Sequence, residues 1–152
     1  MSIGTARESG LMPYRKLRNQ ALGPKKTAWD WFSKYIRLRD SLATTGDASR
    51  CICITCDIEW PSEQIDAGHM IPGRTGGILF DETIVFGQCR RCNREGNGER
   101  QAFKRVMVER NGIEWYELKE QARRTPTKLG DFECRLIAEE YRTKYNALKK
   151  GE

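Results

Sequence analysis

The apolar residues of the N-terminal third recur at the spacing of an amphipathic helix. Trp29, Phe32 and Ile36 lie three and four residues apart, and Pro24 suits a first helical turn. This pattern predicts a helix over about 25–44. The segment TTGDAS that follows favours turns, so the helix is expected to end there.

Three further helices are predicted in the C-terminal half. Phe103 and Met107 share one face of a helix that follows the second cysteine pair and stops at Asn111-Gly112, where glycine favours a left-handed end. A second helix is predicted over about 113–124 and a longer one over about 128–149. The last is expected to carry an apolar face made of Phe132, Leu136, Tyr141, Tyr145 and Leu148.

The middle of the chain shows strand patterns instead. QIDAGHM (64–70) and FDETIVFGQ (80–88) are β-prone and flank the glycine-rich loop PGRTGG, which predicts a two-stranded hairpin. CICITCDIEW reads as a tight knuckle turn followed by a short strand. Helices on both sides of a small hairpin predict an α+β fold.

The length of 152 residues suits one domain with extensions. We expect a flexible basic arm over 1–23 that either lies along a phosphate backbone or has no function of its own, and a folded domain over 24–150. No signal peptide or membrane span is recognisable, which favours a cytoplasmic protein with no membrane partner.

Charge gives a weak indication of the partner. Lysine and arginine number 27 against 21 acidic residues, for a net charge of +6. This balance suits a polyanion such as DNA, but a basic surface that only keeps the chain soluble explains it equally well.

Two cysteine pairs give a stronger indication. Cys53-x-x-Cys56 and Cys89-x-x-Cys92 are separated by thirty-two residues and supply the four thiolates of a closed tetrahedral zinc site. We therefore predict structural Zn²⁺, with free thiols or a redox pair as the alternatives. Cys51 is left outside the site because one intervening residue makes ligation with Cys53 less favourable, and Cys134 is expected to pack in the core.

The single histidine, His69, lies between the two cysteine pairs in Asp66-Ala67-Gly68-His69. Because four cysteines already saturate a zinc ion, His69 is available to take a proton from water. Asn93 directly follows the second pair, and oxygen ligands from Asp66 and Asn93 suit Mg²⁺ or Mn²⁺. A lone histidine is otherwise usually a surface or core residue.

Several arginines accompany these residues. Guanidinium groups match the geometry of phosphate oxygens and neutralise their charge, so they are candidate DNA ligands. Any single one is as easily explained as a solvated surface charge. The candidates are Arg74, Arg90, Arg91 and Arg94.

Taken together, CITC, DAGHM, FDE and GQCRRCN resemble the phage NinG (Rap) family of recombination endonucleases within the HNH superfamily. The resemblance covers roughly residues 28–149. It implies a zinc-stabilised ββα-metal (HNH) core with flanking helices, in which His69 is the general base, Asp66 and Asn93 hold the catalytic ion, and the substrate is branched DNA such as D-loops and Holliday junctions. Cutting both arms of a junction would suit a homodimer.

The chain departs from the HNH pattern at its middle asparagine. Ile84 or a neighbour stands where that asparagine orients the histidine, and Gln88 is a candidate substitute. The third letter is Asn93 instead of histidine. Two alternatives therefore stay open: an HNH nickase without branch preference, and a zinc-stabilised DNA-binding module that does not cut.

Overall fold

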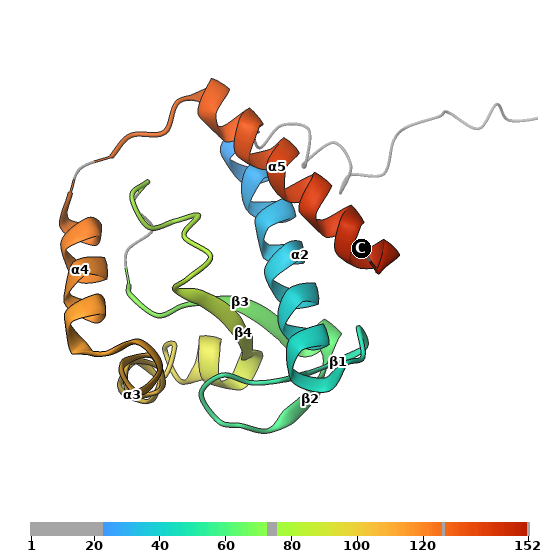
Figure 1. Cartoon of the computed structure of the whole chain (residues 1–152), viewed down its shortest axis with the longest axis vertical. Helices are drawn as coiled ribbons and strands as arrows, with labels where there is room; N and C mark the ends of the chain where they lie inside the picture. The colour runs from blue at the N-terminus through green and yellow to red at the C-terminus, as the bar shows by residue number, and fades with distance from the viewer. Residues whose placement is uncertain (1–22, 73–75, 126, 152) are drawn as a thin grey trace, which may run out of the picture.

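The computed structural model describes residues 23–72, 76–125 and 127–151. Two long helices, α2 (Gly23–Thr45) and α5 (Asp131–Lys150), lie side by side, and two small hairpins lie against α2 (Figure 1). The predicted arm falls almost entirely outside the described residues, as does Arg74. The predicted α+β fold is confirmed.

The two hairpins are separate antiparallel pairs. The first joins β1 (Arg50–Ile52) to β2 (Glu59–Pro61), and the second joins β3 (Ile65–His69) to β4 (Val85–Cys89). A short 3-10 turn, η1 (Ser62–Gln64), connects the hairpins.

The strands match the sequence prediction in outline, but residues 80–84 are turns and not strand. The cause is Asp81, whose carboxylate accepts hydrogen bonds from the backbone N–H (3.0 Å) and the hydroxyl (2.5 Å) of Thr83. A short polar side chain that bonds the backbone two residues on favours a turn over a strand.

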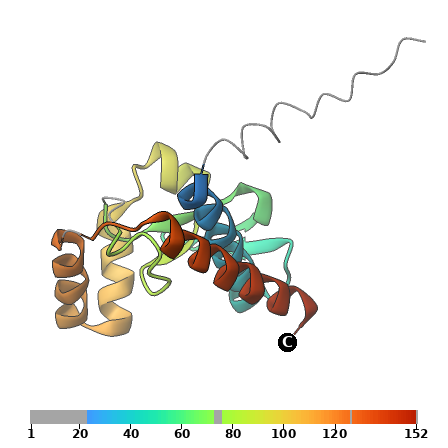
Figure 2. The ribbon, with the colours of Figure 1, turned by 90° about the horizontal axis from the view of Figure 1, so that it is seen from above.

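The two helices after the second cysteine pair lie together at one end of the molecule. Figure 2 shows α3 (Arg100–Asn111) beside α4 (Ile113–Arg124), joined at Gly112, whose φ is 90°. Both helices were predicted, α4 with these bounds. Between β4 and α3, however, lie the π-helical turn η2 (Arg91–Glu95), which contains Cys92, and a left-handed stretch at Asn97, Gly98 and Glu99.

The predicted apolar face of α5 is wrong at its first turns. Phe132 and Leu136 are 67% and 55% exposed, whereas Cys134 and Tyr141 are buried. The packed side is displaced around the helix because α2 meets the positions 134, 137 and 141, which follow one another at helical spacing. The expectation that Cys134 packs in the core is confirmed.

The interior consists of two clusters. The larger is aromatic and centres on Phe32, whose ring lies 4.8 Å from that of Tyr141 and 5.5 Å from that of Phe80, both edge to face. The smaller contains the four cysteines of the two predicted pairs and Cys51, packed with Ile65 and Trp60.

A polar clip fastens α2 to β4 between the two clusters. The buried Asp40 carboxylate accepts the N–H of Gly87 at 2.7 Å, and Arg39 donates to the carbonyls of Glu82 and Val85, both at 2.9 Å. Buried carboxylates are tolerated when they are paired and hydrogen-bonded in this way. The clip therefore fixes the distance between α2 and the second hairpin.

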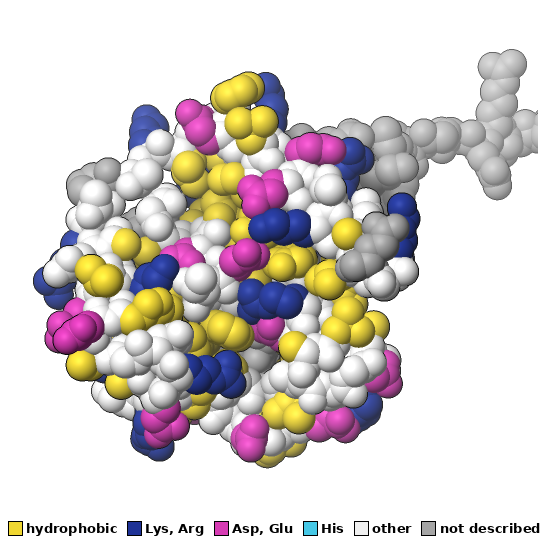
Figure 3. All heavy atoms as spheres, viewed as in Figure 1, with side chains coloured by type: hydrophobic (Ala, Val, Ile, Leu, Met, Phe, Trp, Pro, Cys, Tyr) yellow, Lys and Arg dark blue, Asp and Glu magenta, His cyan; other side chains and the backbone are white. Residues whose placement is uncertain are grey.

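On the surface seen in Figure 3, acidic and basic side chains are interspersed, so the net charge of +6 forms no continuous basic area on that face. Among the described helices, none is both long and apolar enough to cross a membrane.

Candidate active site

The four cysteines of the two predicted pairs come together. Cys53 and Cys56 lie on the turn after β1, Cys89 ends β4, and Cys92 belongs to η2. Their sulfurs all lie within 4.8 Å of one another, and the Sγ atoms of Cys56 and Cys89 are 3.9 Å apart. Four sulfurs bound about 2.3 Å from one zinc ion would be about 3.8 Å apart. The cluster can therefore hold a metal ion.

The surroundings of the sulfurs also fit a metal centre. The N–H groups of Cys89 and Cys92 donate to the Sγ atoms of Cys53 and Cys89 at 3.3 and 3.4 Å. Burial raises the pKa of Cys89 and Cys92. Burial also acts to raise the pKa of Cys53, but hydrogen bonds from Thr55 and Cys89 lower it to about 7. A divalent cation would compensate the cost of burying several thiolates together.

Cys51 lies outside this cluster, as expected. It is fully buried, and its thiol is within 3.6 Å of the Ile52 carbonyl and 3.9 Å of the Thr44 hydroxyl.

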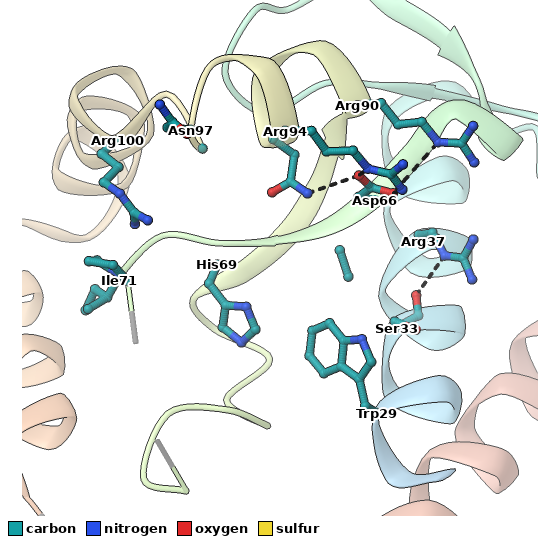
Figure 4. Close-up of a pocket in the computed structure, with 14 residues that line it drawn as sticks. Trp29, Ser33, Arg37, Asp66, His69, Ile71, Arg90, Arg94, Asn97 and Arg100 are labelled. Carbon is teal, nitrogen blue, oxygen red and sulfur yellow. Dashed lines mark hydrogen bonds and ion pairs between the residues drawn. The ribbon is translucent and has the colours of Figure 1, made fainter. Parts of the chain in front are cut away.

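A cleft of about 620 Å³ lies next to the cysteine cluster. It brings together five of the predicted site residues, from β3 and from the segment around η2. Those five are Asp66, His69, Asn93, Arg90 and Arg94. Figure 4 shows that α2 forms the facing wall, with Trp29, Ser33 and Arg37 along one side of the helix.

Asp66 is the centre of the polar network in the cleft. Its carboxylate accepts two hydrogen bonds from Arg94, both at 2.8 Å, and one from the side-chain amide of Asn93 at 3.0 Å. Arg90 completes an ion pair at 3.9 Å. Two parallel N–H···O contacts from one guanidinium fix the orientation of the carboxylate. The same oxygen is a ligand of the type that hard divalent cations prefer.

Asp66 and Asn93 carry side-chain oxygen atoms of the kind that such a cation binds, and the amide nitrogen of Asn93 faces the carboxylate. The carboxylate of Asp66 and the side-chain amide of Asn93 are in direct contact, so both residues reach one point of the cleft. The Arg94 side chain is 60% exposed and lies at the mouth of the network, so it can move aside without disturbing the core. Asp66 and Asn93 are thus the residues that could hold Mg²⁺ or Mn²⁺.

His69 is oriented by two contacts. Its Nε2 lies 3.1 Å from the carbonyl oxygen of Leu79, and its ring stacks on Trp29 with centroids 5.2 Å apart and planes 16° from parallel. The contact with Trp29 was not predicted from the sequence.

The suggestion that Gln88 orients the histidine is wrong. Gln88 is fully buried, and its amide donates to the Gly98 carbonyl at 2.8 Å and the Thr55 hydroxyl at 3.1 Å. It therefore ties β4 to the knuckle. Its side chain also fills the space over Gly68, where an added Cβ would lie 3.0 Å from the Cβ of Gln88.

The arginines divide into two groups. Arg90 and Arg94 line the cleft, whereas Arg91 does not, and its contact with DNA stays a prediction. Arg37 and Arg100 also line the cleft and were missed by the sequence analysis. Among the residues that the structure describes, the lining therefore holds four arginines and one carboxylate.

A comparison with known protein families matches residues 13–152 to the family described as Bacteriophage Lambda NinG protein. Neither the search of curated proteins nor that of solved structures found a match. The matched segment contains both cysteine pairs and every described residue of the cleft. On this basis the chain belongs to the NinG family.

Proposed function

We propose that this protein is a metal-dependent DNA endonuclease of the HNH (ββα-metal) type. The observation that carries the proposal is the single cleft in which Asp66, His69 and Asn93 meet four arginines. A proton acceptor, oxygen ligands for a hard cation, and guanidinium groups for phosphate oxygens are the groups that phosphodiester hydrolysis requires.

In this proposal the cysteine cluster holds structural Zn²⁺. Four sulfurs leave no open coordination position, so the ion would fix the fold and take no part in the reaction. Cys89 is the last residue of β4 and Cys92 lies within η2. An ion bound by both would therefore hold Asn93 and Arg94, which follow Cys92, against Asp66.

The cleft residues divide the work of hydrolysis. His69, held by Leu79 and Trp29, accepts the proton of the attacking water. The arginines bind and orient the phosphate. A Mg²⁺ or Mn²⁺ ion held by Asp66 and Asn93 would supply charge stabilisation at the scissile phosphate.

The proposed substrate class rests on the resemblance of the sequence motifs. The resemblance of the motifs to recombination endonucleases implies branched intermediates, namely Holliday junctions and D-loops. We propose these as substrates, and a homodimer that cuts two arms stays a prediction. Cleavage of a labelled junction, a D-loop and a linear duplex of the same sequence separates branch-selective cutting from an HNH nickase without branch preference.

The direct test is cleavage by wild-type protein and His69→Ala with Mg²⁺ or EDTA. We expect metal-dependent products from the wild type, a loss of at least 10²-fold in the variant, and unchanged zinc content and DNA binding. Wild-type cleavage by His69→Ala would refute the assigned base.

One observation favours a second function, a zinc-stabilised DNA-binding module that does not cut. Ile84 or a neighbour stands where the HNH asparagine is expected, and the side chain of Ile84 is fully buried and apolar, so it cannot hydrogen-bond a histidine. Salt-sensitive binding of DNA without metal-dependent products from the wild type would support this module over the nuclease.

A further inference from the structure

A second groove, of about 380 Å³, lies between α2, η1 and α5. Its floor is closed by hydroxyl contacts: the Oγ atoms of Ser41 and Ser62 are 3.0 Å apart, and Ser62 donates to the carbonyl of Ala48 at 2.8 Å. Ser41 is fully buried. Since these contacts join α2 to η1, the groove is a fixed part of the fold.

Three cations line this groove against one carboxylate. Lys34 and Arg37 come from α2, Lys149 from α5, and the carboxylate is that of Glu63. Within the described part of the chain, none of the three cations forms an ion pair; Lys34 lies over the ring of Trp31 at 4.7 Å, and Arg37 donates to the Ser33 carbonyl at 3.2 Å. Their charges are therefore available to an external anion.

Like the cleft, this groove carries an excess of positive charge. By contrast, another cavity, of about 510 Å³ beside β1 and α3, is lined by one cation, Arg110, and one carboxylate, Asp57. Elsewhere on α5, Lys144 is paired with Glu82 at 3.4 Å and Glu140 at 2.9 Å.

Arg37 connects the groove to the candidate active site, because it lines both. Figure 4 places Arg37 one helical step beyond Ser33 on the wall that faces Asp66. A polyanion that leaves the cleft along α2 would pass Arg37 before it reaches Lys34 and Lys149. Cations that follow one another along a surface are the footprint of a nucleic-acid backbone.

We propose that this groove binds the sugar-phosphate backbone of the DNA on one side of the cleavage site. The proposal rests on the function proposed above and adds a second contact region, so that the substrate runs over Arg37 from the cleft to α5. Backbone contacts of this kind position DNA and carry no sequence information.

The test compares two double variants with equal loss of charge. The groove variant, Lys34→Gln with Lys149→Gln, removes two cations that line the groove but not the cleft. The control variant, Lys25→Gln with Lys128→Gln, removes two exposed cations that line neither the groove nor the cleft. Binding to a short and a long duplex is measured without added Mg²⁺ or Mn²⁺ over a range of NaCl concentrations, and thermal unfolding confirms that all proteins are folded.

We expect the wild type to bind the long duplex more tightly than the short one. The groove variant should lose that gain, and the slope of log K against log salt should become shallower by up to about 2, since each phosphate contact contributes about 0.9. The control should keep the wild-type slope, the gain on the long duplex and the wild-type kcat.

The outcomes separate the two proposals. A groove variant with the wild-type salt slope overturns the groove assignment even if the protein cuts DNA. If the wild type binds DNA without cutting it, and the groove variant has a shallower slope of log K against log salt, the nuclease proposal is overturned and the groove proposal is supported. A wild type that binds no DNA overturns both.

Discussion

The cleft wall formed by β3 and η2 and the wall formed by α2 rest on different kinds of interior. Behind β3 and η2 lie cysteines, Ile65 and a half-buried tryptophan, too little apolar surface to hold two short hairpins. Behind α2 lie the rings of Phe32, Phe80 and Tyr141. A metal ion bound by the cysteines would position one side of the cleft, and the aromatic core positions the other. Each wall should therefore fail under a different perturbation.

The largest effect is expected from Cys53→Ser. Apparent binding free energies of structural zinc are on the order of 10 kcal/mol, and loss of one of four ligands should release the ion. Hydrogen exchange should accelerate in 50–69 and 85–99 and much less in α2 and α5. The matched control is Cys51→Ser, which changes an equally buried thiol outside the cluster and should retain the metal. Equal metal loss in both variants would argue against the assigned ligands.

The aromatic side is tested by Phe32→Ala. Removal of a fully buried phenylalanine should lower the free energy of unfolding by about 3–5 kcal/mol in urea titrations, while the metal stays bound to the folded fraction. Phe132→Ala, on the exposed side of α5, should change it by less than about 0.5 kcal/mol. Similar losses in the two variants would contradict the described packing of α5.

Between the walls, Trp29→Ala should reduce kcat about tenfold, which corresponds to about 1.4 kcal/mol, because the imidazole of His69 loses its stacking partner. KM for DNA should change little, and Trp29→Phe should restore most of the rate. Trp31→Ala is the control, since Trp31 lies on the same helix but contacts Tyr145 and not the cleft. An effect on KM alone would assign Trp29 to DNA binding instead.

An effect of similar size is expected at Asp81, which ties the loop between β3 and β4 to Lys119 of α4 at 2.7 Å. Burial acts to raise the pKa of Asp81, but hydrogen bonds from Lys119 and Thr83 lower it overall. A carboxyl group with a lower pKa when folded binds protons more tightly when unfolded. Its contribution to stability is therefore present above about pH 4 and is lost as the pH falls through the folded-state pKa.

Asp81→Ala should accordingly cost about 1–2 kcal/mol at pH 7, and this difference from the wild type should shrink toward pH 3. Urea unfolding at both pH values measures it. Glu139→Ala, which removes a surface ion pair with Arg142, should cost less than about 0.5 kcal/mol. A difference that grows on acidification would contradict the lowered pKa.

Sequence patterns predicted those features that depend only on the spacing of residues close together in the chain. The bounds of α4 and the convergence of the two cysteine pairs follow from helical period and knuckle geometry, which act over a few residues. Arg90 and Arg94 are one helical turn apart and share the cleft, whereas Arg91 points elsewhere. That distinction follows from the helical period alone.

The second wall of the cleft could not be predicted in the same way. Trp29, Ser33 and Arg37 are four residues apart, so their common face is visible in the sequence. What brings this face to β3 is the clip from Asp40 and Arg39 to β4, formed across more than forty residues. Contacts between such distant segments depend on tertiary packing, which periodicity does not encode.

The close approach of Gly68 and Gln88 has a consequence for how this site can diverge between related chains. Any side chain at 68 would collide with Gln88 across the strand pair, two positions from Asp66 and one from His69. The two positions should therefore covary: a residue larger than glycine at 68 would be accompanied by one smaller than glutamine at 88. Libraries built to alter this site would reach more folded variants if they diversified the two codons as a pair.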